Sequence, residues 1–299
     1  MALTSLRSVE LGVTDVLAAA RFYTEIWGLS QVAAAKDAVY LRGTGAPHYL
    51  VALHRRSKPE LLAITLTAPT RQDIDALHAK LKRAEVGPVE APATIKDPGG
   101  GYGFAFKDPE GRIFRAITGD ARHADAADAP ARPRELAHVV LNSADVPRAT
   151  AFLVDVLGFR LTDQTKMMDF VTCNDHHHNI AFAHADAATL NHIAFELPNL
   201  ESLMRGAGRV RDAGYRIEWG VGRHGPGNNV FAYFVGPEDF VIEYTAEVQL
   251  IDSTYRVGRP DDWKWPPGRV DHWGISDPPS DRMKAAQKKI RFADTVALA

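Results

Sequence analysis

The feature that most constrains this fold is an internal repeat with a spacing of about 130 residues. The segment LRSVELGVTDVLAAARFYTEIWGL at residues 6–29 matches LAHVVLNSADVPRATAFLVDVLGF at residues 136–159. Each copy reads as a short apolar strand, an Asp that can cap a helix, and a helix with one apolar stripe that ends at Gly. Two further pairs of segments recur in the same order: residues 61–69 with 190–198, and residues 106–118 with 234–246. Three collinear matches indicate that the second half repeats the structure of the first.

The repeat predicts the fold class and the domain organisation. Each half holds a strand, a helix and a run of strands, twice over, which predicts an α+β protein with two domains. A stretch rich in Ala, Asp and Pro, without apolar periodicity, separates the halves, and a final stretch rich in Trp, Pro and Arg has no counterpart in the first half. The predicted divisions are an N-terminal domain at residues 1–119, a linker at 120–134, a C-terminal domain at 135–247 and a C-terminal extension at 248–299.

The composition narrows the class of partner. The 35 basic side chains are balanced by 37 acidic ones, so no one-sided field attracts a nucleic acid or a membrane surface. The N-terminus carries no apolar run typical of a signal peptide, and the chain has no apolar span of ~20 residues. Cys173 is the single cysteine, which excludes an intrachain disulfide and favours a reducing compartment. We therefore expect a cytoplasmic enzyme or a small-molecule binding module.

Three residues of the second half form a candidate metal site. His138, His192 and Glu243 fall on three separate expected strands, and two imidazoles with one carboxylate suit Fe(II) because they leave coordination positions open. A single histidine on a strand is usually a hydrogen-bonded core residue, but three candidates at matched repeat positions favour a metal. The counterparts in the first half do not form such a triad: Ser8, Ala63 and Arg115. The repeat thus predicts a site that only the second half retains.

A second group of polar residues lies close to the last of these ligands. In GRHGPGNNVFAYFVGPEDFVIEY, residues 222–244, GPGNN reads as a turn and VFAYFV as a strand. Such a hairpin can bring His224 and Tyr233 over a ligand held by Glu243. A further cluster, at residues 174–196, holds five of the chain's 12 histidines.

With these residues in hand, the second half resembles the type I extradiol ring-cleaving dioxygenases of the vicinal-oxygen-chelate superfamily. The resemblance covers roughly residues 1–247, and its motifs are concentrated in residues 136–244. It implies paired βαβββ modules in each domain, which curl each sheet into an incomplete barrel around a cavity.

The resemblance also implies roles for individual residues. The metal ligands would be His138, His192 and Glu243, the acid/base would be His178, and the residues that contact the substrate would be His224 and Tyr233. The alternative acid/base is His177, one position earlier. The remaining histidines of the cluster are expected to be bystanders: His176, His177 and His184.

The function that the resemblance implies is cleavage of a catechol-type ring with O2 at a non-haem Fe(II) site. Both oxygen atoms would enter a product of the muconic semialdehyde type. Mn(II) accepts the same ligands, and relatives form homo-oligomers. The alternatives are a glyoxalase-like lyase or isomerase of the same superfamily and a metal-free binding module. The former usually draws its ligands from more than one module, and the latter needs no triad.

Overall fold

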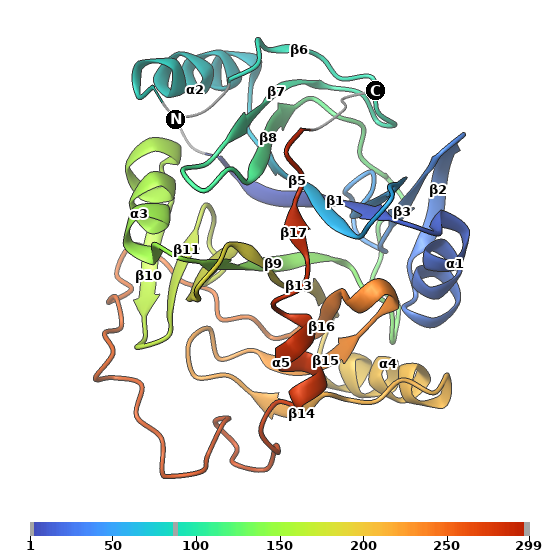
Figure 1. Cartoon of the computed structure of the whole chain (residues 1–299), viewed down its shortest axis with the longest axis vertical. Coiled ribbons are helices and arrows are strands. Elements are labelled where there is room, and N and C mark those ends of the chain that lie inside the picture. Colours follow the sequence, from blue (N-terminus) through green and yellow to red (C-terminus); the bar gives the residue numbers. More distant parts are fainter. Residues whose placement is uncertain (1–2, 86–88, 296–299) are drawn as a thin grey trace.

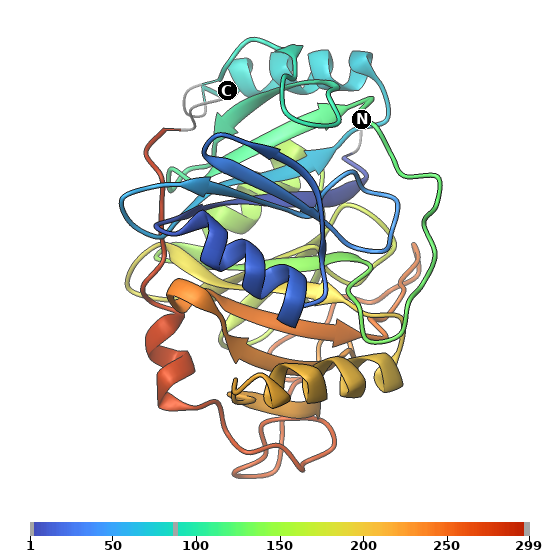
Figure 2. The same ribbon diagram turned by 90° about the vertical axis from the view of Figure 1, so that its right-hand side faces the viewer.

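The computed structural model describes residues 3–85 and 89–295 and contains two large mixed sheets. The first sheet has the strand order β2-β3-β4-β1-β5-β8-β7-β6, with a short strand β17 added beside β5. The second has the order β10-β11-β12-β9-β13-β16-β15-β14, which is the first order shifted by eight strands. The two sheets lie one above the other (Figures 1 and 2). The duplication predicted from the repeat is therefore present in the topology.

Each sheet is built from two βαβββ modules, as the fold class predicts. The first two modules comprise β1 (Ser5–Val13), α1 (Val16–Arg21), η1 (Phe22–Ile26), β2 (Ser30–Ala35), β3 (Ala38–Arg42), β4 (Val51–Arg55), β5 (Glu60–Thr67), α2 (Arg71–Arg83), β6 (Ala93–Thr94), β7 (Tyr102–Lys107) and β8 (Ile113–Thr118). The other two comprise β9 (Glu135–Ser143), α3 (Val146–Ala151), η2 (Phe152–Leu157), β10 (Arg160–Gln164), β11 (Met168–Thr172), β12 (Ile180–His184), β13 (Thr189–Glu196), α4 (Leu200–Asp212), β14 (Trp219–Arg223), β15 (Val230–Val235), η3 (Pro237–Asp239) and β16 (Val241–Ala246). Neither sheet closes into a barrel, which confirms the predicted α+β class with incomplete barrels.

The caps predicted for the two repeated helices are present. Asp15 accepts a hydrogen bond from the backbone of α1, and Asp145 does the same for α3. Both helices continue as a π-helical turn, η1 or η2, where the repeat predicted one α-helix. After η2 the chain turns through Gly158 in the left-handed conformation, at φ +82°.

The two halves are joined through aromatic side chains of these π-helical turns. The ring of Trp27, directly after η1, stacks on Tyr244 of the second sheet with ring centroids 3.7 Å apart. In the opposite direction, Phe152 of η2 lies 6.4 Å from Phe106 of the first sheet. Each half therefore contributes its first helical segment to the core of the other.

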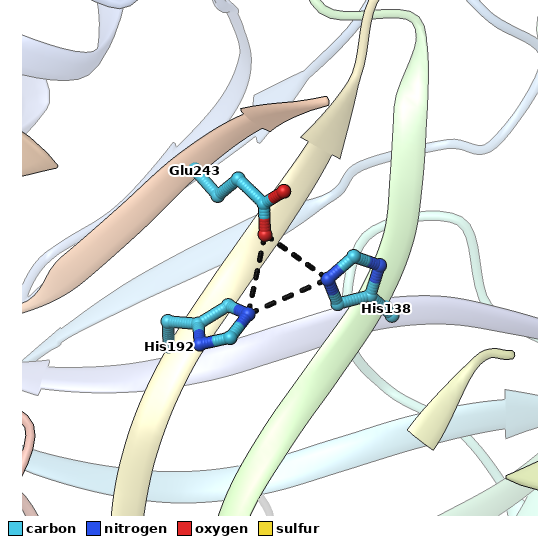
Figure 3. A group of neighbouring side chains, drawn as sticks. All are labelled: His138, His192 and Glu243. Carbon is cyan, nitrogen blue, oxygen red and sulfur yellow. Dashed lines mark hydrogen bonds and ion pairs between the residues drawn. The ribbon is translucent and has the colours of Figure 1, made fainter. Parts of the chain in front are cut away.

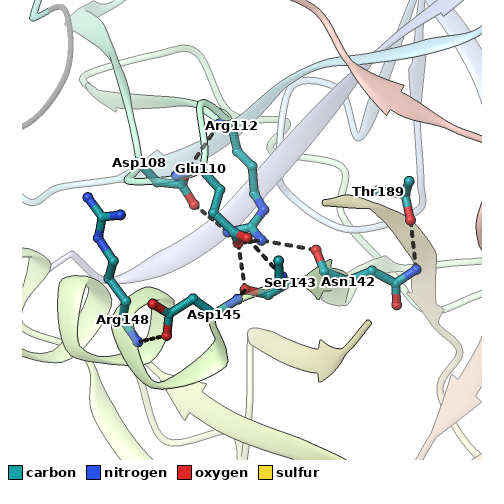
Figure 4. A network of polar contacts seen from close by, with 9 residues as sticks. Asp108, Glu110, Arg112, Asn142, Ser143, Asp145, Arg148 and Thr189 are labelled. Atoms are coloured by element: carbon teal, nitrogen blue, oxygen red, sulfur yellow. Dashed lines mark hydrogen bonds and ion pairs between the residues drawn. The ribbon is translucent and has the colours of Figure 1, made fainter. Parts of the chain in front are cut away.

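A buried polar network also joins the halves (Figure 4). Arg112 is fully buried and donates hydrogen bonds to Asp108, to Glu110 and to the backbone oxygen of Asn142 in β9. Glu110 in turn accepts a hydrogen bond from Ser143 at the end of β9. Because the guanidinium contacts two carboxylates and one carbonyl, its burial is compensated.

The residues after β16 run across the second sheet and then reach the first (Figure 1). They are mostly irregular, apart from α5 (Asp281–Ala286) and β17 (Arg291–Phe292), which pairs with β5. The domain boundaries stay a prediction. No helix within residues 3–85 and 89–295 is long and apolar enough to span a bilayer.

Candidate metal centre

The three predicted ligands meet on adjacent strands of the second sheet (Figure 3). His138 lies on β9, His192 on β13 and Glu243 on β16, and both His138 and Glu243 stand opposite Ala194 in the strand register. Glu243 Oε2 lies 3.1 Å from His138 Nε2 and 3.2 Å from His192 Nε2. The two imidazole nitrogens are 3.4 Å apart. The fold thus brings three ligand atoms from distant parts of the chain within reach of one ion.

The chemistry of this donor set fits a divalent cation. All three residues are buried, with Glu243 at 0% exposure, and among the described residues Glu243 Oε1 has no hydrogen-bond partner. Burial alone would raise the pKa of Glu243, but charge and hydrogen bonds from His138 and His192 hold it well below its ordinary value. Burial lowers the pKa of His192 to about 4. At neutral pH the triad therefore offers an anionic carboxylate from Glu243 and a neutral imidazole from His192, which are the forms that bind metals.

His178 lies beside this triad and is held by a chain of buried hydrogen bonds. Its ring centroid is 4.3 Å from that of His138, and its Nδ1 is 3.0 Å from His177 Nδ1. The other nitrogen of His177 lies 2.8 Å from Asp163 Oδ2. Burial, together with the neighbouring His138 and His177, holds the pKa of His178 well below its ordinary value. His178 is consequently neutral, with one side facing the ligands and the other facing His177.

The second predicted pair also lies at the triad. His224 Nε2 is 3.0 Å from the hydroxyl of Tyr233 and 3.7 Å from Glu243 Oε1. Tyr233 stands opposite Glu243 in the strand register. Burial and the nearby Glu243 raise the pKa of Tyr233 well above its ordinary value, so its hydroxyl stays protonated. Trp219 stacks on the Tyr233 ring at 5.0 Å and fixes its orientation.

The turn that carries His224 packs closely on His178. Gly227 adopts φ +78°, and a Cβ there would lie 3.0 Å from His178 Cε1. At the base of the turn, the backbone oxygen of Asn229 accepts a hydrogen bond from His224 N–H at 2.9 Å. A side chain at position 227 would push against the imidazole, so glycine is required by both backbone conformation and space.

The structure therefore brings together all six residues that the sequence singled out: His138, His178, His192, His224, Tyr233 and Glu243. It corrects one expectation, because His177 is not a bystander: it is fully buried and bonded to both Asp163 and His178. His184, by contrast, is exposed at the end of β12. Sequence reasoning missed Asp163 on β10, since nothing in the local pattern links it to a histidine in the segment between β11 and β12.

The chain matches a protein-family profile described as the Glyoxalase/Bleomycin resistance protein/Dioxygenase superfamily over residues 5–115 and 135–244. Metapyrocatechase 2 from Cupriavidus necator is 30% identical over 188 residues, covering 53% of this chain and 58% of that protein, so the match spans less than two thirds of that relative. Biphenyl-2,3-diol 1,2-dioxygenase from Paraburkholderia xenovorans is 25% identical over 304 residues, covering 95% of this chain and all of the relative.

A solved structure is also similar along nearly the whole chain. The Mn(II)-bound glyoxalase from Novosphingobium aromaticivorans superposes with a TM-score of 0.87 at 36% sequence identity, covering 94% of each chain.

Proposed function

We propose, from the premise that this chain belongs to the Glyoxalase/Bleomycin resistance protein/Dioxygenase superfamily, that it is an extradiol dioxygenase. It would open the ring of a catechol-type substrate with O2 and place both oxygen atoms in a product of the muconic semialdehyde type. The observation that carries the proposal is the buried triad of His138, His192 and Glu243 with His178 at its side. The names of two relatives, metapyrocatechase 2 and biphenyl-2,3-diol 1,2-dioxygenase, support the same chemistry.

The triad would hold the metal ion. His138 and His192 would each supply an imidazole nitrogen and Glu243 one negative charge, so a bound divalent ion would leave a net positive centre that attracts a catecholate. When bound, a ferrous ion lowers the pKa of a coordinated hydroxyl and holds the two reactants side by side. Fe(II) is our assignment, and Mn(II) accepts the same three ligands.

His178 would move the substrate proton. Asp163 accepts a hydrogen bond from His177 Nε2–H, which leaves His177 Nδ1 as an acceptor for His178 Nδ1–H. The lone pair of His178 is then on Nε2. In this tautomer His178 can take a proton from a catechol hydroxyl and later return it to an oxygen of the product. The low pKa of His178 keeps it in the accepting form.

His224 and Tyr233 would orient the substrate oxygens. The protonated Tyr233 hydroxyl is a hydrogen-bond donor, and His224 is the partner 3.0 Å away. Together they can donate to a catecholate oxygen and hold the anion in one orientation. The turn that carries His224 packs at Gly227 on His178, which places His224 and His178 beside the same ligands.

The test is oxygen consumption by the reconstituted enzyme. Purified protein is loaded with ferrous ion under anaerobic conditions and then mixed with aerated buffer and a panel of substituted catechols. We expect one O2 consumed per catechol and a coloured ring-opened product. His138→Ala, treated identically, is the control for metal-dependent chemistry. Absence of oxygen uptake across the panel, with metal bound, would overturn the proposal.

A glyoxalase-like lyase or isomerase that uses Mn(II) is the second candidate. It is favoured by the 36% identity to a Mn(II)-bound glyoxalase. Such an enzyme would turn over its substrate without O2, so anaerobic assays with Mn(II) separate the two functions. The ligand set from the second half alone favours the dioxygenase, because Ser8, Ala63 and Arg115 offer no ligand set in the first half. A metal-free binding module would hold no stoichiometric metal after purification.

The finer assignments follow from the same proposal. We place the enzyme in the cytoplasm because a single cysteine suits a reducing compartment. The family resemblance is the basis for proposing a homo-oligomer. We retain the predicted domains at residues 1–119 and 135–247, the linker at 120–134 and the extension at 248–299. Size-exclusion chromatography with light scattering tests the oligomeric state.

A further inference from the structure

A chain of side-chain amides connects His192 to the C-terminal extension. His192 Nδ1 lies 2.8 Å from Asn191 Oδ1, and Gln287 Nε2 donates to the same oxygen at 2.7 Å. Asn191 Nδ2 donates to Asn142 Oδ1 at 2.8 Å. Asn142 Nδ2 then donates to the backbone oxygen of Gln287, also at 2.8 Å. The chain of contacts therefore begins and ends at Gln287.

The backbone carbonyl of Gln287 fixes the direction of every hydrogen bond in this series of amides. A backbone carbonyl can only accept, so Asn142 must turn its NH2 group towards Gln287 and its oxygen towards Asn191. Asn191 must then turn its NH2 group towards Asn142 and its oxygen towards His192. Because that oxygen can only accept, His192 Nδ1 carries the proton. The lone pair of His192 is consequently on Nε2, the atom that faces Glu243 and His138.

The strand geometry explains how Asn191 and His192, which are adjacent in β13, can belong to the same hydrogen-bond path. The register between β9 and β13 shifts between Leu190 and His192, which marks a β-bulge at Asn191. A bulge re-aims a side chain that would otherwise point to the opposite face from its neighbour. Asn191 can therefore contact the ring of His192 and still reach Asn142 and Gln287.

Gln287 is held firmly enough to set this orientation. It is the C-cap of α5, whose Met283 and Ala286 are buried against Tyr233 and its neighbours. Just beyond it, the backbone oxygen of Ile290 accepts a hydrogen bond from Leu190 N–H at 2.9 Å. The extension is thus fixed on both sides of Gln287, by the second sheet and by the strand that carries His192.

The first half provides a comparison that lacks the chain of amides. The same register shift occurs between β1 and β5, but the counterparts of Asn142 and Asn191 are Gly12 and Leu62. Gly12 has no side chain, and Leu62 is buried and apolar. The bulge is therefore a property of the fold, whereas the amides accompany the half that carries the triad.

We propose that Gln287 is a positioning residue for the metal ligand His192: through Asn191 and Asn142 it selects the His192 tautomer whose Nε2 binds the ion. This inference rests on the proposed metal centre. It gives the C-terminal extension a role at the site without contact with the metal or the substrate. The assignment is independent of whether the bound ion serves a dioxygenase or a lyase.

The test measures metal affinity without turnover. Mn(II) is titrated into metal-free protein under anaerobic conditions and followed by electron paramagnetic resonance. Gln287→Met keeps an unbranched side chain of similar length and removes the N–H donor. We expect it to weaken Mn(II) binding about 10-fold, within the range for partners of metal-binding histidines. Gln72→Met, on the exposed face of α2, is the matched control and should bind as wild type does.

A double-mutant cycle separates this role from simple packing. Asn191→Leu installs the side chain that the first half has, and should weaken binding about 10- to 100-fold. Adding Gln287→Met to Asn191→Leu should cause little further loss, because both act through one hydrogen-bond path. Thermal unfolding of each metal-free variant reports the fold, and 15N spectra of labelled histidine report the His192 tautomer, which a purely structural role would not move.

Several outcomes would overturn the inference. These are Gln287→Met affinity within twofold of wild type, losses that add in the double variant, or an unchanged His192 tautomer in Asn191→Leu, which removes the acceptor of His192 Nδ1. If Gln287→Met does not fold, the 15N spectrum of Asn191→Leu decides, since an unchanged tautomer there refutes the path. Failure of wild type to bind either Mn(II) or Fe(II) would remove both proposals. Metal binding without oxygen uptake would remove only the dioxygenase.

Discussion

The two sheets place different charges at equivalent positions. In the second sheet, His138 and Glu243 stand opposite Ala194. In the first sheet, Ser8 and Arg115 stand opposite Thr65 in the same register. A negatively charged ligand residue in one half is thus replaced by a guanidinium in the other.

The replacement changes how each buried site is neutralised. Arg115 forms buried ion pairs with Glu10 and with Asp97, the latter at 2.6 Å. The first half therefore supplies its own cation, covalently attached to the chain. The second half instead presents Glu243 with a carboxylate oxygen, Oε1, that accepts no hydrogen bond from the described residues, and an ion from solvent would neutralise it. The comparison teaches that one scaffold can stabilise its centre either from within or with a bound ion.

The largest effect should come from removing a metal ligand in the second half, compared with the matched change in the first half. His138→Ala should abolish stoichiometric metal binding and all metal-dependent turnover, because two ligands on neighbouring strands do not hold the ion. Ser8→Ala is the matched change in the first half and should leave both unchanged. Metal content after reconstitution and oxygen uptake measure the outcome. An equal loss in Ser8→Ala would contradict the asymmetry between the halves.

The next effect concerns the acid/base. His178→Ala should leave metal bound and lower turnover by about 10²- to 10⁴-fold, the usual contribution of a positioned acid or base. His48 is the counterpart of His178 in the repeat, and His48→Ala should keep full turnover. Stopped-flow assays with saturating catechol measure both. Undiminished turnover in His178→Ala would remove this residue from the mechanism.

A change in the first half should affect stability and leave metal binding alone. Arg115→Leu removes the cation from Glu10 and Asp97, and leaving buried charges unpaired costs about 3–5 kcal/mol of folding free energy. Mn(II) affinity of the folded variant should equal that of wild type. Denaturant unfolding and metal titration make the two measurements. A large loss of Mn(II) affinity would show that the halves are coupled.

Removing the metal should destabilise the second half selectively. Metal at 100 times its dissociation constant stabilises the folded state by about 2.7 kcal/mol, so a chelator should remove that contribution. Amide hydrogen exchange should quicken in β9, β13 and β16 and stay constant in β1, β5 and β8. Mass spectrometry of the exchanged peptides measures the strands of both sheets in one experiment. Equal acceleration in the two sheets would refute the idea that the first half is self-sufficient.

The smallest effect should come from Asp163. Asp163→Asn keeps the shape of the side chain and removes its charge, so the hydrogen bond that orients His177 weakens. We expect kcat to fall by about 10- to 100-fold with little change in KM, by analogy with partners that orient functional histidines. Ala33 is the residue at the repeat-equivalent position in the first half, so no counterpart of this chain exists there. A change confined to KM would argue against an orienting role.

The repeat pattern was sufficient to predict the fold class and the triad of His138, His192 and Glu243, whereas the role of His178 followed only from the family resemblance. Matching Ser8 with His138, and Arg115 with Glu243, requires only the spacing of apolar segments, and the strand registers bear out those alignments. The periodicity and spacing of apolar segments can be read from the sequence itself, without knowledge of tertiary contacts.

The residues that orient the site could not be predicted in this way. Asp163 reaches His177 across neighbouring strands, and Asn191 acts through a bulge that the sequence does not mark. Gln287 belongs to a segment without a repeat partner, so no internal comparison was possible. These contacts depend on the path of an irregular chain, which local propensity does not determine.

The route of the extension has a consequence for biosynthesis. All strands of both sheets except β17 have been translated by Ala246, whereas Tyr255 and Gly258, which bond to Asp163, are made afterwards. A nascent chain that ends between Ala246 and Tyr255 already contains His138, His192 and Glu243 but lacks these two residues that bond to Asp163. Completion of the hydrogen bonds around the candidate metal centre therefore requires the C-terminal extension.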